Sequence, residues 1–213
     1  GVAPIAVDTE GNNSIIVVTG ANDLLTAVEV EAARPAIAAS SILVCQLEIP
    51  PDINLAALRI ARAEGVKAIF NPAPARSEIP QEFYQLSDIF CPNETETELL
   101  TGMSVQSLEE AENAARVLIK RGAGVVILTL GERGSLLVTD ATTEHVPVAP
   151  VKALDTTGAG DAFVGSLAFF LAAGKSLSDA IKRANRIAAV SVQSSGTQSS
   201  FPEAKGLPSE LMK

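Results

Sequence analysis

The sequence is poor in the residue types on which several classes of site depend. Its 213 residues include no Trp, one Tyr and one His, and aromatic residues make up 4% of the chain. Stacking platforms for nucleic-acid bases or proline-rich peptides are therefore not expected. The single histidine, His145, excludes a multi-histidine metal site, and no Gly-x-Ser-x-Gly turn is present to support a Ser–His–Asp hydrolase. We expect His145 at a solvated or edge position.

Charge and cysteine usage exclude further classes of partner. The formal net charge is −9 and no basic patch is present, so nucleic acid is not an expected partner. The cysteines, Cys45 and Cys91, lie in apolar runs and are expected to be small buried side chains rather than a disulfide. The sequence shows no signal peptide and no apolar run long enough to span a bilayer. We therefore expect no membrane partner and a cytoplasmic protein, or a nuclear one if the source is eukaryotic.

Most of the chain alternates short apolar runs with helix-like segments, which predicts an α/β fold. The expected strands are residues 42–47, 66–70, 88–91 and 125–130, followed by an antiparallel pair at 135–139 and 143–148. The expected helices are residues 23–39, interrupted or kinked at Pro35, and 51–64, 93–101, 107–121, 159–173 and 178–194. Fully apolar strands joined by helices imply parallel pairing with right-handed crossovers. We predict a three-layer α/β/α sandwich with a mainly parallel central sheet, in one domain spanning residues 1–213.

The first 19 residues follow a different pattern. Two apolar runs, 1–7 and 14–19, flank the polar turn Glu10–Asn13, which predicts a hairpin. Residue 1 is Gly rather than Met, and the chain begins inside the first apolar run. We expect the chain to be a fragment, a processed product or the product of an incomplete gene model, with residues 20–213 as its core.

Polar side chains follow the apolar runs at the points where the predicted strands end. Because the carboxyl ends of parallel strands meet at one edge of a sheet, ligands of such folds bind there. Chance could supply one or two polar residues at these points, but five in one sheet predict a site along that edge. The five are Glu48, Asn71, Asn93, Thr129 and Asp155.

The most informative stretch runs from Asp155 to Asp161 and joins a Val-rich, strand-like run (146–154) to an apolar helix. Gly158 and Gly160 allow a tight turn with exposed amides, and the first N–H groups of a helix carry partial positive charge, which together predict a phosphate or oxyanion site. A carboxylate beside that site would repel a resting phosphate. We therefore expect Asp161 to accept a proton from an attacking nucleophile. The alternatives are a helix cap or dipole complement for Asp161, and a plain tight connection for the Gly-Ala-Gly turn.

Six pieces of the sequence, in order and spacing, resemble the ribokinase-like carbohydrate kinases, and within them the ribokinase branch. The Asp155–Asp161 stretch is the most specific, and the Asn-Pro-Ala-Pro-Ala and Asn-Glu-Thr-Glu pieces favour ribokinases over fructokinases or adenosine kinases. The pieces are residues 46–48, 71–75, 92–96, 129–131 with Gly134, 155–161 and 196–200. The Walker-type phosphate loop is absent, so the phosphate site is of another kind.

This resemblance implies an activity. The chain would transfer the γ-phosphate of ATP to the 5-hydroxyl of D-ribose, giving D-ribose 5-phosphate and ADP, with Mg²⁺ required and K⁺ activating. Asp161 would be the catalytic base and would contact the sugar. The amides of residues 158–161, among them Gly158, Ala159 and Gly160, would form the anion hole for the transferred phosphate. Small molecules, ribose and ATP, are the implied partners, and full-length members are expected to form homodimers.

The resemblance also implies binding residues. Asn93 and Glu96 would organise the Mg²⁺–phosphate water shell, Glu96 through water, although an Asn N-cap with Glu at the third helical position is an alternative that holds together with it. Glu48 would contact the sugar, where an isolated Glu after a strand would otherwise be a solvated end. Asn71 is mainly a turn residue before Pro72, with a substrate-side role as the alternative. The implied nucleotide contacts are Thr129, Gly131, Gly134 and Asn185, together with Asn93.

A monovalent-cation site is implied around Asp155. A K⁺-sized ion needs several oxygen ligands, which a carboxylate, hydroxyls and turn carbonyls provide. The alternative for the Ser-rich segment is a plain exit from a helix C-terminus. The implied ligand residues are Asp155, Thr157, Ser191, Ser194, Gly196 and Ser200.

The sequence departs from the family at its beginning. The Gly-Gly-Lys-Gly run and the Asn/Asp pair that grip the sugar in the family, and most strands of its lid, are not in this sequence, and residues 1–19 resemble what remains of the lid. Three alternatives to the implied activity stay open. They are a truncated, inactive nucleotide-binding or scaffold protein, a sibling kinase for fructose or a nucleoside, and a subunit of another complex.

Overall fold

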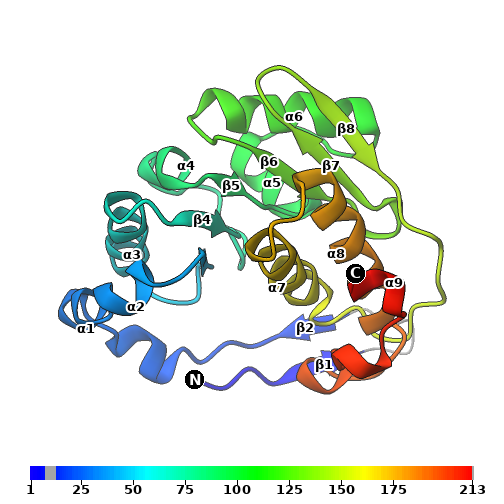
Figure 1. Ribbon diagram of the computed structural model, residues 1–213, viewed down its shortest axis with the longest axis horizontal. Helices are drawn as coiled ribbons and strands as arrows, with labels where there is room; N and C mark the ends of the chain where they lie inside the picture. Colours follow the sequence, from blue (N-terminus) through cyan, green and yellow to red (C-terminus); the bar gives the residue numbers. More distant parts are fainter. Residues whose placement is uncertain (8–12, 213) are drawn as a thin grey trace. The chain divides into compact units, whose positions relative to one another are not determined.

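The computed structural model describes residues 1–7 and 13–212 (Figure 1). The chain separates into two compact units. One, here called the sheet unit, comprises Gly1–Ala3, Val17–Leu130 and Leu136–His145. The other, here called the helix-pair unit, comprises Pro4–Ile16, Gly131–Ser135 and Val146–Lys213. The predicted single domain over residues 1–213 stays a prediction.

The sheet follows the chain order from one edge to the other. Strands β3, β4, β5 and β6 are parallel neighbours, with Ile42 opposite Lys67, Ile69 opposite Ile89 and Phe90 opposite Val126. Strands β7 and β8 come next and are joined by a short turn, in which the Thr139 amide donates to the Thr142 carbonyl, so they must run antiparallel. The mixed six-stranded sheet confirms the predicted parallel pairing of the earlier strands and the antiparallel pair that follows them. The strands are β3 (Ile42–Cys45), β4 (Lys67–Phe70), β5 (Ile89–Phe90), β6 (Val126–Thr129), β7 (Ser135–Val138) and β8 (Thr143–Val146).

Capping residues define where three of the helices of the sheet unit begin. Thr26, Asn93 and Ser107 each form a capping box with a Glu three residues later, which satisfies amides that the helix leaves unpaired. The predicted interruption near Pro35 is confirmed, because the chain breaks into two helices at Ala33. The helices are α1 (Ala27–Ala32), α2 (Arg34–Ala38), α3 (Pro51–Ala63), α4 (Glu82–Leu86), α5 (Glu94–Thr101) and α6 (Leu108–Lys120), preceded by the 3₁₀ turn η1 (Gly20–Leu24).

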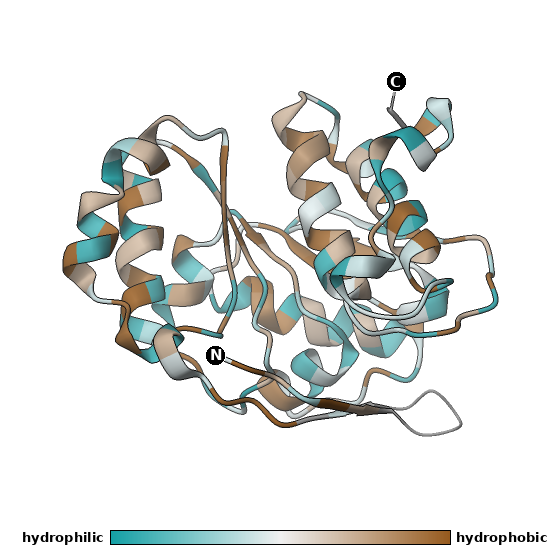
Figure 2. Cartoon of the chain, turned by 90° about the horizontal axis from the view of Figure 1, so that it is seen from below, coloured by the Kyte–Doolittle hydropathy of each residue, from teal (hydrophilic) through white to brown (hydrophobic). Residues whose placement is uncertain are grey.

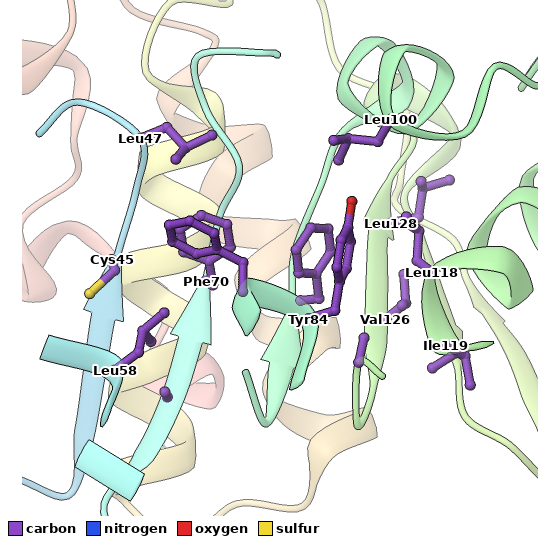
Figure 3. Packing of buried hydrophobic residues seen from close by; sticks show 14 of the residues in the cluster. Cys45, Leu47, Leu58, Phe70, Tyr84, Leu100, Leu118, Ile119, Val126 and Leu128 are labelled. Atoms are coloured by element: carbon purple, nitrogen blue, oxygen red, sulfur yellow. The ribbon is translucent and has the colours of Figure 1, made fainter. Parts of the chain in front are cut away.

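The core of the sheet unit contains buried aromatic side chains from β4, β5 and α4. The rings of Phe70 and Phe83 stack with their centroids 4.5 Å apart, and those of Tyr84 and Phe90 stack at 4.9 Å (Figure 3). Such pairs stabilise the fold by about 0.5–1.5 kcal/mol beyond the burial of their apolar area. Figure 2 colours the chain by hydropathy. The strands of the sheet are largely hydrophobic, whereas the helices also carry hydrophilic residues. This packing holds β4 and β5 in place, and so positions the polar residues that follow them, Asn71 and Asn93.

The helix-pair unit is dominated by α7 (Ala159–Ala172) and α8 (Leu177–Ser191), which pack side by side (Figure 1). Ser176 caps α8 by accepting a hydrogen bond from the Asp179 amide at 3.3 Å. The unit also contains the antiparallel pair β1 (Ile5–Val7) and β2 (Asn13–Ile15), the 3₁₀ turns η2 (Gly131–Arg133), η3 (Gln198–Ser200) and η4 (Ala204–Gly206), and the short helix α9 (Ser209–Met212).

Several sequence predictions need correction. The run 42–47 is not a strand buried on both faces, because β3 is the first strand of the sheet and three of its four residues are only half-buried. The run 146–154 is not a strand beyond Val146, since Pro147 and Pro150 lack the amides that a sheet requires. Helices α4 and α9 were not predicted. The predicted hairpin is confirmed in part by β1 and β2, but residues 10–12 of its turn lie outside the described residues.

The remaining predictions on single residues agree with the structure. Cys45 and Cys91 are buried free thiols, and burial raises the pKa of the Cys45 thiol to about 12. His145 is exposed in β8, the last strand of the sheet. Among residues 1–7 and 13–212, no helix combines the length and apolar character that crossing a bilayer would require.

Candidate active site

Gly158 forms the turn that leads into α7. It is the N-cap residue of the helix, with φ at +82°, a backbone conformation that glycine adopts without strain. A Cβ atom at this position would lie 3.1 Å from the Cε1 atom of Phe201 and 3.5 Å from the Cα of Thr197. The turn is therefore both bent sharply and packed against the segment that follows α8.

The turn presents backbone amides at the start of α7. Ala159 donates to the Thr156 carbonyl at 3.2 Å, and Ala162 donates to the Gly158 carbonyl at 2.9 Å. Between them, the amides of Gly160 and Asp161 have no hydrogen-bond acceptor in the described part of the chain. Unpaired amides at a helix N-terminus carry partial positive charge and bind anions. This segment, residues 155–161, is called the anion turn below.

The Asp161 carboxylate lies in the first turn of α7 but does not cap it. The N-cap position receives no side-chain hydrogen bond, and within residues 1–7 and 13–212 the carboxylate has no hydrogen-bond or ion-pair partner. Asp161 is exposed, yet the surrounding protein removes part of its hydration, and this desolvation raises the pKa of the carboxyl. An uncommitted carboxylate with a raised pKa is suited to accept a proton from a bound hydroxyl.

Asp155 connects the anion turn to the segment after α8. Its Oδ1 accepts a hydrogen bond from the Thr157 amide at 3.0 Å, and its Oδ2 accepts one from the Gly196 amide at 2.9 Å. The Gly196 bond, followed by those from Thr157, lowers the pKa of Asp155. The backbone bonds of Leu154 and Asp155 to the Val192 carbonyl hold the same two segments together. Asp155 is therefore a structural link in addition to its predicted role as a cation ligand.

Four of the other predicted cation ligands lie in the segment 191–200, and the fifth, Thr157, lies in the anion turn beside Asp155. Ser191 is buried and donates from Oγ to the Ala188 carbonyl, and buried Ser200 donates from Oγ to the Thr197 carbonyl at 2.6 Å. The Ser194 amide donates to the Ser191 carbonyl at 3.2 Å. Oxygen atoms of a carboxylate, hydroxyls and turn carbonyls are thus gathered within one unit, and such a donor set fits a monovalent cation. The assignment of this site stays a prediction.

The lowered pKa of Asp155 predicts how acid affects the link. A group whose pKa is lower in the folded state stabilises the fold above its unfolded pKa of about 3.9, and this contribution is lost as the pH falls through the folded pKa. Asp155→Asn is expected to be less stable than the wild type at pH 7, with the difference shrinking toward pH 3. Urea denaturation at several pH values measures this difference. A difference that does not vary with pH would contradict the prediction.

A second polar cluster lies in the sheet unit, where β4, β5 and β6 end. Asn71 donates from Nδ2 to the Cys91 carbonyl at 2.8 Å and to Glu96 Oε2 at 3.4 Å. Asn93 and Thr129 form a parallel bridge, and the Thr129 amide donates to the Pro92 carbonyl at 3.0 Å. The predicted meeting of strand-end polar residues is confirmed for Asn71, Asn93 and Thr129. The prediction that Asp155 ends a strand is wrong, because no strand directly precedes that residue.

Glu96 is the buried carboxylate of this cluster. It is 3% exposed, accepts hydrogen bonds from the Asn93 amide at 2.9 Å and from Asn93 Nδ2 at 3.0 Å, and is reached by Asn71. Burial raises its pKa, and the hydrogen bonds oppose that effect. Both oxygens already have protein donors, so the geometry fits a role for Glu96 toward Mg²⁺ through water better than direct ligation. The capping alternative is confirmed, since Asn93 and Glu96 form a capping box.

The other predicted contact residues differ in their surroundings. Glu48 is exposed in the segment after β3, and Gly131 is exposed in η2. Asn185 is buried, and its Nδ2 donates to Ser135 Oγ at 3.0 Å and to the Val146 carbonyl at 2.9 Å, while its Oδ1 accepts from Ser135 Oγ. The amide of Asn185 is therefore committed to structure, and its contact with adenine or ribose stays a prediction. Gly134 is buried against the backbone of Val146.

The sequence predictions missed Phe201, which packs on Gly158. The available signal was an aromatic residue directly before a proline, at the end of a Ser-rich segment in a chain with few aromatics. In the described ranges 1–7 and 13–212, no group of three or more His, Cys, Asp and Glu side chains is arranged to hold a metal ion.

Known proteins resemble this chain over nearly its whole length. The family model of the pfkB family carbohydrate kinases matches residues 1–204. A ribokinase of Mus musculus is 49% identical over 99% of this chain and 67% of its own length, and a deoxyribokinase of Salmonella typhi is 39% identical over 95% of this chain and 66% of its own length. The structure of Arabidopsis thaliana ribokinase complexed with ribose and ATP is similar with a TM-score of 0.86 and 32% identity, covering 99% of this chain and 68% of that one. The chain thus spans about two thirds of the length of these relatives.

Proposed function

Because the chain belongs to the pfkB family of carbohydrate kinases, we propose that it transfers the γ-phosphate of ATP to the 5-hydroxyl of D-ribose. The family and the α/β fold class predicted from the sequence are confirmed by the matches to ribokinases. Ribose and ATP are proposed as substrates because the solved Arabidopsis thaliana relative is a complex with both. The homodimer expected for full-length members stays a prediction.

One observation carries this proposal: Asp161 has no partner in the described part of the chain, although it stands beside the unpaired amides of the anion turn. A carboxylate that served as a helix cap would accept a hydrogen bond from an amide of the first turn. A carboxylate that served only as a surface charge would repel a phosphate bound at the turn. A proton acceptor next to an anion-binding turn is the arrangement that phosphoryl transfer to a hydroxyl requires.

In the proposed mechanism the sugar hydroxyl attacks the γ-phosphorus of ATP in line with the bond to the leaving ADP oxygen. The hydroxyl proton passes to a carboxylate oxygen of Asp161 as the new P–O bond forms and the P–O bond to ADP breaks. The amides of Gly160 and Asp161 donate to the phosphoryl oxygens, on which negative charge is spread in the transition state. Gly158 and Ala159 shape the turn that aims these amides.

The remaining residues have supporting roles in the proposal. Mg²⁺, when bound with ATP, would neutralise phosphate charge, and exposed Asn93 together with buried Glu96 would orient its water shell. Thr129, Gly131 and Gly134 are proposed nucleotide contacts, and Glu48 a sugar contact. K⁺ is proposed to bind the oxygens gathered around Asp155 and to order the segment 191–200.

The direct test is a coupled assay of ADP formation by this chain, with and without ribose. Ribose-dependent ADP formation that is lost in Asp161→Asn would support the proposal. A chain that binds ATP but shows no turnover above that variant would instead favour an inactive nucleotide-binding protein. Gel filtration and thermal denaturation of both proteins would show that the comparison is between folded chains.

A second candidate substrate is favoured by the deoxyribokinase relative, which is 39% identical to this chain. Ribose and 2-deoxyribose differ by one hydroxyl, and a site that hydrogen-bonds a hydroxyl discriminates strongly against the analogue that lacks it. A substrate panel of ribose, 2-deoxyribose, fructose and adenosine would decide between them. A higher kcat/KM on any of the other three would overturn the assignment of ribose.

The raised pKa of Asp161 predicts the acid limb of the pH–rate profile. Only the ionised carboxylate accepts a proton, so activity falls as the pH drops through the pKa of Asp161. Because desolvation raises this pKa, the limb in kcat/KM is expected above pH 3.9, the ordinary value for Asp. A limb at or below that value, measured over the range in which the protein stays folded, would contradict the proposed environment of Asp161.

A further inference from the structure

Phe201 is the side chain that closes the anion turn from the side of the segment after α8. A Cβ atom added to Gly158 would meet the Phe201 ring at 3.1 Å (Cε1) and 3.4 Å (Cζ), so the ring edge lies directly on the glycine. Gly158 has no side chain of its own with which to resist movement, and glycine has the largest backbone freedom of any residue. The order of the turn at this point therefore depends on what packs against it.

The backbone of Phe201 is itself restrained. Its amide donates to the Gln198 carbonyl at 3.3 Å, which ends η3. Pro202 follows it, and the helical region is disfavoured for a residue before proline, in agreement with the observed φ of −67° and ψ of 124°. Buried Ser200 bonds the Thr197 carbonyl through both its amide, at 3.1 Å, and its hydroxyl, at 2.6 Å. The ring is thus attached to a well-anchored stretch of chain.

The same stretch is tied to the anion turn at a second point. Asp155 Oδ2 accepts from the Gly196 amide while Oδ1 accepts from the Thr157 amide, so one carboxylate holds both segments. The polar link acts before Gly158, and the Phe201 ring acts on Gly158 itself. Together they restrain the turn on both sides of its left-handed residue.

We propose that Phe201 is a positioning residue for the anion turn, which holds Gly158 so that the amides of Gly160 and Asp161 stay aimed at the transferred phosphate. The proposal rests on the function proposed above for that turn. Phe201 acts through Gly158 and does not itself contact the reacting atoms. Donors that are in place before the reaction stabilise the transition state more than donors that must be ordered during it.

Phe201→Ala tests the proposal, with Phe201→Tyr as the conservative variant and Phe169→Ala as the matched control. Phe169 is an aromatic residue of the same unit that is 55% exposed, compared with 36% for Phe201, and it lies on α7 away from the turn. The first readout is amide exchange by NMR at Thr157, Ala162 and Gly196, whose hydrogen bonds report on the turn and its link. The exchange rates of these amides are expected to rise about tenfold in Phe201→Ala and in neither of the other variants, because local opening of the turn becomes easier.

The second readout is steady-state kinetics. In Phe201→Ala we expect kcat to fall by about 5–10-fold with a KM for ATP that changes less than about twofold, since the loss is in transition-state alignment. Phe201→Tyr should restore both exchange and kcat, and Phe169→Ala should leave both unchanged. A merely structural Phe201 would lower the thermal stability without this split between kcat and KM.

The outcomes separate this inference from the proposed function. Unchanged amide exchange in Phe201→Ala, or raised exchange with the kcat of the wild type, would overturn the positioning role. Raised exchange in a chain that shows no sugar-dependent ADP formation would overturn the proposed function, and with it the role toward the transferred phosphate, while supporting the packing of Phe201 on the turn. The exchange comparison of the three variants does not need turnover, so it supports or rejects the contact in either case.

Discussion

Asp161→Asn is expected to lower kcat by about 10²–10⁴-fold, the range over which a general base contributes to catalysis. The amide side chain is nearly the same size as the carboxylate but cannot accept the proton of the attacking hydroxyl. Steady-state assay of ADP formation measures the loss. The thermal stability should change little, because the carboxylate has no partner in the described part of the chain and its ionised form is disfavoured by desolvation.

Asp179→Asn is the matched control for this variant. Asp179 also lies in the first turn of a helix of the same unit, α8, but its Oδ2 accepts a hydrogen bond from Arg183 Nε at 3.0 Å. Its replacement should leave kcat unchanged and lower the stability modestly, because it removes one partner of an ion pair in which the Arg183 side chain is 14% exposed and the Asp179 side chain 40% exposed. If Asp161 served only to complement the helix dipole, Asp161→Asn would instead lose about 0.3–1 kcal/mol of stability and keep its kcat.

Gly134→Ala is expected to lower the free energy of unfolding by about 3 kcal/mol or more. The new Cβ would lie 2.2 Å from the Val146 carbonyl oxygen and 2.9 Å from the Cα of Pro147, both of which are backbone atoms that cannot rotate away. The φ of +86° adds the cost of a left-handed conformation for a residue with a side chain, about 1–2 kcal/mol, to the cost of overpacking, about 1–3 kcal/mol. Urea denaturation measures the loss.

Gly174→Ala separates the two contributions. Gly174 has a similar φ of +81°, but a Cβ there would have nothing within 4 Å. Gly174→Ala should therefore lower the free energy of unfolding only by the cost of the left-handed conformation, about 1–2 kcal/mol. Equal losses in the two variants would show that the close approach of Gly134 to Val146 contributes nothing.

Much of the fold could be predicted from local patterns in the sequence. The capping boxes that begin α5 and α6 depend on residues three positions apart, so Asn93 with Glu96 and Ser107 with Glu110 indicate those helix starts directly. The apolar runs predicted β4, β5 and β6 to within one or two residues. The helices α4 and α9 were not predicted, because elements of four or five residues show too little periodicity to be distinguished from loops.

The candidate site likewise has features that could be predicted from the sequence and features that could not. The anion turn could be predicted because its glycines, amides and carboxylate lie within seven consecutive residues. The environment of Asn185 could not, because its partners Ser135 and Val146 are 50 and 39 positions away in the sequence. The same holds for β3, whose apolar sequence does not reveal that it is the first strand of the sheet.

The sequence by itself determined that Gly158 bends the chain before an apolar helix and that Asp161 stands in the first turn of that helix, because backbone conformation and helix geometry act over a few residues. Only the tertiary structure decided that Asp161 has no partner among the described residues, that Asp155 holds the Gly196 amide, and that Phe201 packs on Gly158. These three facts depend on which distant segments pack together. Packing is set by the burial of side chains across the whole unit, and no local pattern specifies it.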